Sequence, residues 1–119
     1  MMQENNPSYE FIYELVKKYK GKILIDNGCL RNEFKKIYYK ETIGLDIQYN
    51  KEIDIEADVK NLPIKDKSVD LFISNFVLEH VEDEEVYLRE MKRCLNKNGK
   101  IILSIPRPIW YLAYFLSPG

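Results

Sequence analysis

A strand, turn and helix pattern near the N-terminus constrains the fold of this chain more than any other feature. Residues 22–26 form a short apolar run that ends in an acid, and Asn27 and Gly28 follow directly. Residues 31–39 then have the apolar spacing of a short helix. This order is the opening unit of an α/β nucleotide-binding sheet. The glycine would let backbone N–H groups approach a ligand at the start of the helix.

The composition indicates one small globular domain, which we expect to span residues 1–119. The chain is 45% hydrophobic and 31% charged, which is typical of a globular chain and excludes a wholly disordered one. Its 18 basic and 19 acidic residues give a net charge of -1. Because there is no basic surplus, we do not expect a nucleic-acid partner.

Metal, disulfide and membrane signals are weak in this sequence. Cys29 and Cys94 lie far apart, and the single His80 has no companions at metal-ligand spacing, so we expect no metal site. No secretory signal is visible at the N-terminus. The longest apolar run, residues 109–116, is too short to span a bilayer. We therefore expect a cytoplasmic protein with free thiols that does not associate with membranes.

The rest of the chain alternates between strand-like and helix-like periodicity. The predicted strands are residues 22–26, 42–46, 52–58, 69–74 and 100–105. The predicted helices are residues 8–20, 31–39 and 82–96, with Gly99 as a left-handed cap after the last. The expected inner face of that last helix consists of Val86, Leu88, Met91, Cys94 and Leu95. Alternation of this kind implies a parallel α/β sheet over residues 22–105, followed by an apolar tail, residues 106–119.

Two longer blocks carry a family resemblance. The first reads Ala-Asp-Val-Lys-Asn-Leu-Pro at residues 57–63 and continues, at residues 67–81, as Lys-Ser-Val-Asp-Leu-Phe-Ile-Ser-Asn-Phe-Val-Leu-Glu-His-Val. The second covers residues 88–100. Together they resemble the class I S-adenosylmethionine-dependent methyltransferases that act on small molecules. The resemblance implies a three-layer Rossmann-like sandwich with a parallel sheet of order 3-2-1-4-5, truncated relative to the seven-stranded family fold. It also implies S-adenosylmethionine as cofactor.

The resemblance assigns the first turn to the methionine end of the cofactor. In the family this turn reads Asp-x-Gly-Cys-Gly-x-Gly and binds through backbone contacts. Here Asp26 and Gly28 match it, whereas Leu30 and Asn32 stand where the second and third glycines are expected. Asn32 can hold a left-handed backbone, but Leu30 adds a side chain where the cofactor normally approaches backbone.

The resemblance also places four further residues at the cofactor. Asp46, at the end of the second strand, matches the acid that accepts both ribose hydroxyls. Asp58 matches the acid that reads the exocyclic amine of adenine, with Val59 beside it as apolar cover. Asn75 matches the position that faces the sulfonium and the substrate. No catalytic nucleophile is expected, because alignment of the acceptor with the methyl group carries much of the rate.

Ordinary structural explanations compete with these assignments. Asp46 can be a solvated turn acid, and Asp58 can be a helix or turn cap. Three functions follow: a methyltransferase with an unidentified small-molecule acceptor, a degenerate relative that serves as a binding or scaffold subunit, or a nicotinamide-binding Rossmann unit. The third is disfavoured because the fingerprint G-x-G-x-x-G is absent.

The apolar tail suggests self-association. Residues 109–116 are aromatic and apolar, and the resemblance leaves the fifth strand without its usual neighbour. Unpaired strand edges and apolar patches favour association. We expect a homodimer in which the tail packs on a second subunit or closes over the edge beside residues 101–105. The alternative is a monomer whose tail folds back on its own sheet.

Overall fold

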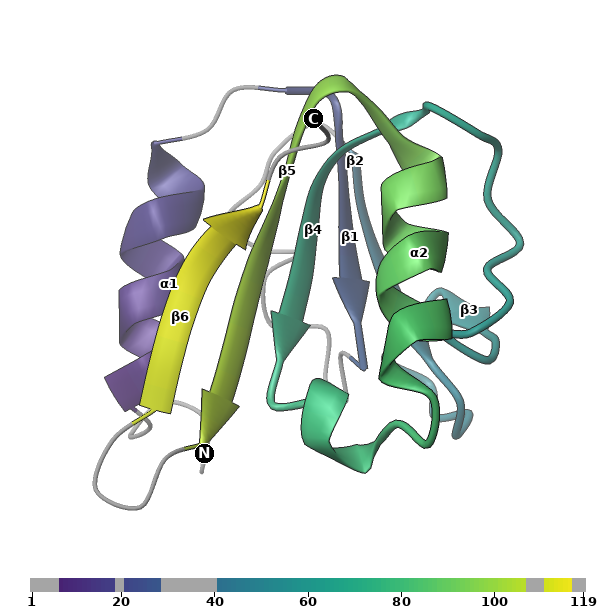
Figure 1. Ribbon diagram of the computed structural model, residues 1–119, viewed down its shortest axis with the longest axis horizontal. Coiled ribbons are helices and arrows are strands. Elements are labelled where there is room, and N and C mark those ends of the chain that lie inside the picture. The colour runs from purple at the N-terminus through teal and green to yellow at the C-terminus, as the bar shows by residue number, and fades with distance from the viewer. Residues whose placement is uncertain (1–6, 19–20, 29–40, 107–110, 117–119) are drawn as a thin grey trace.

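The chain folds into a six-stranded sheet with a helix on each face (Figure 1). The computed structural model describes residues 7–18, 21–28, 41–106 and 111–116. The described helices are α1 (Pro7–Lys17), α2 (Glu84–Cys94) and a 3₁₀ helix (Leu78–His80). The strands are β1 (Ile23–Asn27), β2 (Glu41–Asp46), β3 (Ile55–Glu56), β4 (Val69–Asn75), β5 (Leu95–Pro106) and β6 (Tyr111–Leu116). The helix predicted over residues 31–39 lies outside the described residues.

The sheet has the order β3-β2-β1-β4-β5-β6, and its first five strands are parallel to their neighbours. The predicted order 3-2-1-4-5 is therefore confirmed. From β1 the chain first moves outward through β2 and β3, and then returns to place β4 on the other side of β1. The strand order thus reverses between β1 and β4, which is where ligands bind in open α/β sheets.

The two long helices cover opposite faces of the sheet (Figure 1). Because alternate residues of each strand point to opposite sides, each central strand contributes side chains to both faces. On the face of α1, the buried residues are Ile12, Val16, Leu24, Leu71, Ile73 and Ile102. On the face of α2 they include Ile25, Phe72, Tyr87, Met91, Ile101 and Leu103. The three predicted layers are therefore present. The central strands are buried on both faces, as their nearly continuous apolar sequences require.

Asp70 binds the start of β1 to its neighbours at the amino ends of the strands, away from the turn at Gly28. One of its carboxylate oxygens accepts the backbone N–H groups of Lys22 and Ile23 at 2.6 and 2.8 Å. The other oxygen accepts the side-chain amide of Asn96, which belongs to β5. This acid from β4 therefore holds three strands in register across 47 residues of sequence.

The third strand is shorter than predicted. Residues 52–58 were expected to pair with β2, but only Ile55–Glu56 do so. The Asp54 carboxylate accepts the backbone N–H of Gly44 at 2.8 Å, and the N–H of Asp54 donates to the Gly44 carbonyl. Before it, the Asn50 side chain closes a local turn by accepting the N–H of Glu52. Local side-chain bonds to backbone thus replace part of the expected ladder.

The prediction for Gly99 is wrong. The helix α2 ends at Cys94, and the strand β5 begins at once with Leu95, so Gly99 lies inside a strand. The backbone N–H groups of Lys67 and Ser68 donate to the carbonyls of Arg93 and Cys94, and they satisfy the end of the helix without a left-handed residue.

Space, not helix capping, accounts for the glycine at position 99. The pairing of β4 with β5 is irregular between Val69 and Leu71, and Gly99 lies beside this irregularity. A Cβ at Gly99 would come within 2.6 Å of Leu95 Cδ2 and 2.9 Å of the Val69 carbonyl oxygen. Both distances are shorter than ordinary contacts.

The apolar tail folds back on its own sheet. The strand β6 pairs antiparallel with β5, from Ile101 opposite Leu116 to Pro106 opposite Tyr111. The expectation that the fifth strand has an unpaired edge is therefore wrong, because β6 supplies the missing ladder. Closure of the tail over the edge beside residues 101–105 is confirmed. Homodimer formation stays a prediction. The strand edge at which a second subunit would pack is now the outer edge of β6.

Gly99→Ala should lower the free energy of unfolding by about 1–3 kcal/mol, because the added methyl group meets backbone and a packed leucine. Urea unfolding followed by circular dichroism measures the change. Lys97→Ala, an exposed substitution in the same strand, is the control and should stay within about 0.5 kcal/mol of the wild type. Equal stability of the two variants would contradict the steric explanation.

Candidate functional site

The carboxyl ends of β1, β2 and β4 bring together three of the residues singled out in the sequence. Asp26 is the penultimate residue of β1, and Asp46 and Asn75 end β2 and β4. Asn27 of β1 pairs with Leu45 on one side and Ser74 on the other. Asp46 and Asn75 each follow one of these paired residues. They therefore lie in the next row of the sheet, on either side of Gly28.

Gly28 turns the chain sharply at the point where β1 ends. Its φ is +67°, in the left-handed region that disfavours residues with a Cβ. A Cβ built here would lie 2.6 Å from Cγ2 of Val77, which follows β4. The Gly28 N–H donates to the Leu45 carbonyl at 2.7 Å. The turn therefore requires glycine for its backbone and for its packing against the segment after β4.

Two acids are buried at adjacent strand ends. Asp26 is 4% exposed and Asp46 is 8% exposed. Burial raises the pKa of the Asp26 carboxyl well above its ordinary value, and the charge of Asp46 raises this pKa further. Asp46 is anchored by the backbone N–H of Gln48 at 3.1 Å from Oδ1. Asp46 places a negative charge beside the turn, and a cationic group bound there would also favour the ionised form of Asp26.

A buried polar cluster beneath the turn was missed by the sequence analysis. The Tyr87 hydroxyl of α2 donates to Ser74 Oγ at 2.6 Å, and both residues are fully buried. Burial is the main reason that the Tyr87 pKa is raised. Asn27 is also fully buried and lies near enough to affect that pKa. Its side-chain amide makes no hydrogen bond of standard geometry within the described part of the chain.

The helical spacing contained a signal for Tyr87. Tyr87, Met91 and Cys94 are the buried residues of α2, and they are spaced i, i+4 and i+7. The expected inner face included Val86 and Leu88, which are only partly buried. A tyrosine in register with the two most buried positions of an amphipathic helix must bring its hydroxyl into the core, where it needs a polar partner.

Asp58 closes a turn after β3. Its Oδ1 accepts the N–H of Lys60 at 2.9 Å, and its carbonyl accepts the N–H of Asn61 at 2.9 Å. The structure therefore confirms that Asp58 caps a turn. The second carboxylate oxygen makes no hydrogen bond within the described residues, and the side chain is exposed. Val59 is half-buried against the core on the α2 face. Asp58 can therefore cap its turn and still accept a hydrogen bond from a ligand.

The end of β4 is held by β5. Oδ1 of Asn75 accepts a hydrogen bond from the Ser104 hydroxyl, and the Phe76 N–H donates to the Ser104 carbonyl at 3.0 Å. Phe76 has a φ of +58°, which is costly for a residue with a bulky side chain. Strained backbone of this kind gathers at ligand sites. Ser104 thus fixes both the amide of Asn75 and the turn that follows it.

The described residues contain neither a group of three or more metal-ligating side chains nor a helix long and apolar enough to cross a membrane. Leu30 and Asn32, the two departures in the first turn, lie outside the residues that the structure describes.

Gly28→Ala should lower the free energy of unfolding by about 2–4 kcal/mol, since it adds backbone strain and a clash with Val77. In the double variant Gly28→Ala/Val77→Ala the clash is gone and only the strain remains. The two substitutions should therefore be less than additive in urea unfolding. Strict additivity would show that Val77 does not restrict position 28.

The pKa of Asp26 predicts how stability changes with pH. A carboxyl with a raised pKa holds its proton in the folded state at pH values where the unfolded chain, with an ordinary pKa of 3.8, has lost it. Stability from this group is complete below pH 3.8 and falls as pH rises toward the folded pKa. Asp26→Asn removes this dependence, so its stability relative to the wild type should increase upward from pH 3.8, by at most about 1.4 kcal/mol per pH unit.

Urea unfolding of both proteins at a series of pH values from 3.5 to about 7 measures this difference. Carboxylates that do not interact with Asp26 contribute equally to both proteins and cancel, whereas Asp46 is coupled to Asp26, so the measured difference belongs to the pair. A difference that is independent of pH would mean that Asp26 keeps its ordinary pKa in the folded chain.

Comparison with known proteins agrees with the geometry of the strand ends. A model of the methyltransferase-domain family matches residues 26–103, from Asp26 into β5, which is well over half of the chain. An uncharacterised protein of Methanocaldococcus jannaschii is 33% identical over 108 residues, which cover 82% of this chain and 48% of that protein. A Mycobacterium tuberculosis protein, named a probable S-adenosylmethionine-dependent methyltransferase, is 29% identical over 94 residues, with 77% and 32% covered.

A solved structure shares the same fold. The crystal structure of a candidate S-adenosyl-L-methionine-dependent methyltransferase from Methanococcus maripaludis matches with a TM-score of 0.68 and 26% identity, over 82% of this chain and 55% of that chain. This chain spans less than half the length of the two curated relatives above. Because the family model covers both blocks that carried the resemblance, this chain belongs to the class I S-adenosylmethionine-dependent methyltransferase family, whose cofactor is S-adenosylmethionine.

Proposed function

We propose that residues 1–119 form a methyltransferase domain that binds S-adenosylmethionine at the carboxyl ends of β1 to β4. In this proposal the domain takes part in methyl transfer to a small-molecule acceptor. The observation that carries the proposal is the Gly28 turn, with buried carboxylates from Asp26 and Asp46 beside it. The cofactor has a sulfonium and an ammonium group, so two buried acids at a glycine turn suit its charge.

The residues at the strand ends fit this cofactor. The Asn27 amide is buried without a standard hydrogen bond in the described residues. This feature suits a turn that is completed by a ligand. We assign Asp26 and Gly28 to the methionine end and Asp46 to the ribose hydroxyls.

The adenine end is assigned to the loop after β3, and the reacting end to the segment after β4. The open carboxylate oxygen of Asp58 would accept the exocyclic amine, and Val59 would contribute apolar contact. Asn75, whose Oδ1 is held by Ser104, would line the reacting end of the site and could offer its NH₂ group to the methyl acceptor.

The bound cofactor supplies a methyl group on a sulfonium, which is a good leaving group. The chain has to bind it, orient it and bring the acceptor into line. The Ser104 bond to Asn75 and the strained turn at Phe76 fix the protein side of this alignment. No nucleophile of the protein is required, and we assign no catalytic residue.

Three finer features belong to the same proposal. The net charge of -1 favours a small-molecule acceptor over nucleic acid. A buried free thiol at Cys94 is consistent with a reducing cytoplasm. Homodimer formation would use the outer edge of β6, since β6 is the last strand of the sheet on that side.

Asp46→Ala should weaken the binding of S-adenosylhomocysteine by about 1.5–3 kcal/mol, because hydrogen bonds to a charged group are lost. Isothermal titration calorimetry on the purified chain measures this. Glu41→Ala removes an exposed acid from the opposite end of the same strand and should leave the affinity unchanged. Equal affinity of wild type and Asp46→Ala would refute the ribose assignment. Preference of the wild type for NAD would refute the proposed function.

A further inference from the structure

The loop that carries Asp58 has little support from the sheet. Residues 57–68 connect β3 to β4, and β3 pairs with β2 through two residues only. On the upstream side, the Ala57 N–H donates to the Asp46 carbonyl at 3.0 Å. The turn around Asp58 itself uses local bonds to Lys60 and Asn61. The position of Asp58 therefore depends on what holds the downstream half of the loop.

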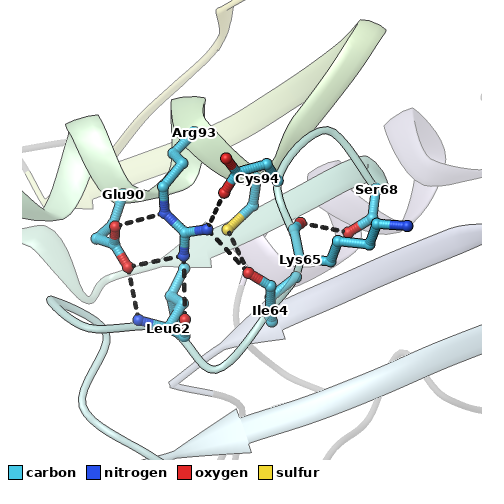
Figure 2. Close-up of polar contacts among 8 residues, drawn as sticks. Leu62, Ile64, Lys65, Ser68, Glu90, Arg93 and Cys94 are labelled. Atoms are coloured by element: carbon cyan, nitrogen blue, oxygen red, sulfur yellow. Dashed lines mark hydrogen bonds and ion pairs between the residues drawn. The ribbon is translucent and has the colours of Figure 1, made fainter.

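A pair of charged residues on α2 holds that downstream half, as Figure 2 shows. Glu90 and Arg93 lie one helical turn apart, and Arg93 Nε donates to Glu90 Oε1 at 2.8 Å. Arg93 Nη2 donates to the Leu62 carbonyl at 3.0 Å, and Nη1 donates to the Ile64 carbonyl at 2.9 Å. Glu90 Oε2 accepts the N–H of Leu62 at 2.7 Å. We call this pair the Glu90–Arg93 clasp.

Every N–H of the guanidinium is used in the clasp. Besides the two loop carbonyls, Arg93 makes a second bond to Glu90, at 3.1 Å from Nη2, and a bond from Nη1 to Asp66. A guanidinium offers five donors in a fixed planar fork, and here each one has an acceptor. The hydrogen bond from Arg93 is also the main reason that the pKa of the Glu90 carboxyl is lowered. A lysine has the charge but cannot reproduce this planar arrangement.

The last turn of α2 adds further anchors to the same loop. The N–H groups of Lys67 and Ser68 donate to the Arg93 and Cys94 carbonyls at 3.1 and 2.8 Å. Leu62 is 4% exposed and packs in the core on the α2 face. The loop is therefore fixed to the helix over most of its downstream half, beginning at Leu62. That residue is only four positions after Asp58.

We propose that Glu90 and Arg93 are positioning residues for recognition of the adenine amine, acting through the segment from Asp58 to Leu62. The inference rests on the proposed function and adds to it the residues that place Asp58. Neither side chain needs to touch the cofactor. The clasp fixes the backbone at Leu62, and the short segment back to Asp58 then sets where the open carboxylate oxygen lies.

Two probes test this inference by equilibrium binding. One is S-adenosylhomocysteine, and the other is its analogue with purine in place of adenine, which lacks the 6-amino group. The wild type should bind the first about tenfold more tightly, the value of a hydrogen bond to a charged acceptor. Arg93→Gln should reduce this preference to about twofold, as Asp58→Ala should. The double variant should lose no more than either single variant, because both changes remove the same contact.

Controls separate positioning from general damage. Lys92→Gln removes an exposed charge from the same helix and should keep the tenfold preference. Arg93→Lys retains the charge and serves if Arg93→Gln does not fold; it should also lose most of the preference. Amide hydrogen exchange at Leu62 gives a readout without ligand, and the N–H of Leu62 should exchange faster in both Arg93 variants.

Each outcome has a distinct meaning. An undiminished preference in a folded Arg93 variant would overturn the inference and leave the proposed function intact. Equal binding of both probes by the wild type would overturn the role of Asp58, and the inference with it. Failure of the wild type to bind either probe would overturn the proposed function itself. Unchanged exchange at Leu62 would show that the clasp does not hold the loop.

Discussion

The pairing of β1 with parallel neighbours on both sides is the constraint on which the rest of the structure depends. β2 and β4 register against the same residues of β1, so their last residues are brought level with the turn at Gly28. The acids and the amide at these ends therefore meet without any special loop. Because β1 is buried on both faces, its polar residues must lie at its carboxyl end, where the strands of the sheet stop. Asp26 and Asn27 nevertheless remain buried there, which is a cost that a ligand of suitable charge would offset.

The helix α2 contributes to the core and to the site with different residues of its surface. Tyr87, Met91 and Cys94 are buried against the sheet, and the Tyr87 hydroxyl reaches Ser74 in β4. One turn further along, Glu90 and Arg93 bind the loop that follows β3. A single helix thus connects the central strands with an edge strand of only two residues. On the weakly paired side of the sheet, this helix thus adds contacts to the loop after β3 that the two-residue ladder does not supply.

Apolar periodicity predicted the strands and their parallel direction, and it placed Asp26, Asp46 and Asn75 at or near strand ends. The strand order itself was implied by the family resemblance. Prediction from the sequence failed where side chains bond to distant backbone. The helix end at Cys94 is satisfied by Lys67 and Ser68, more than twenty residues earlier in the chain, so Gly99 was mistaken for a cap. The role of Arg93 was equally hidden, since its acceptors lie in a loop about thirty residues away.

The tie made by Asp70 has a consequence for how the chain acquires its structure during synthesis. The N–H groups that it accepts belong to residues 47 and 48 positions earlier, and Asp70 itself lies in β4, the strand that pairs with β1. Until the ribosome has released that segment, β1 has no partner on one side and its apolar edge is open. Contacts of this sequence separation form slowly. A nascent chain that stops short of residue 75 would therefore hold β1 without its β4 neighbour, and an unpaired strand edge of this kind favours association.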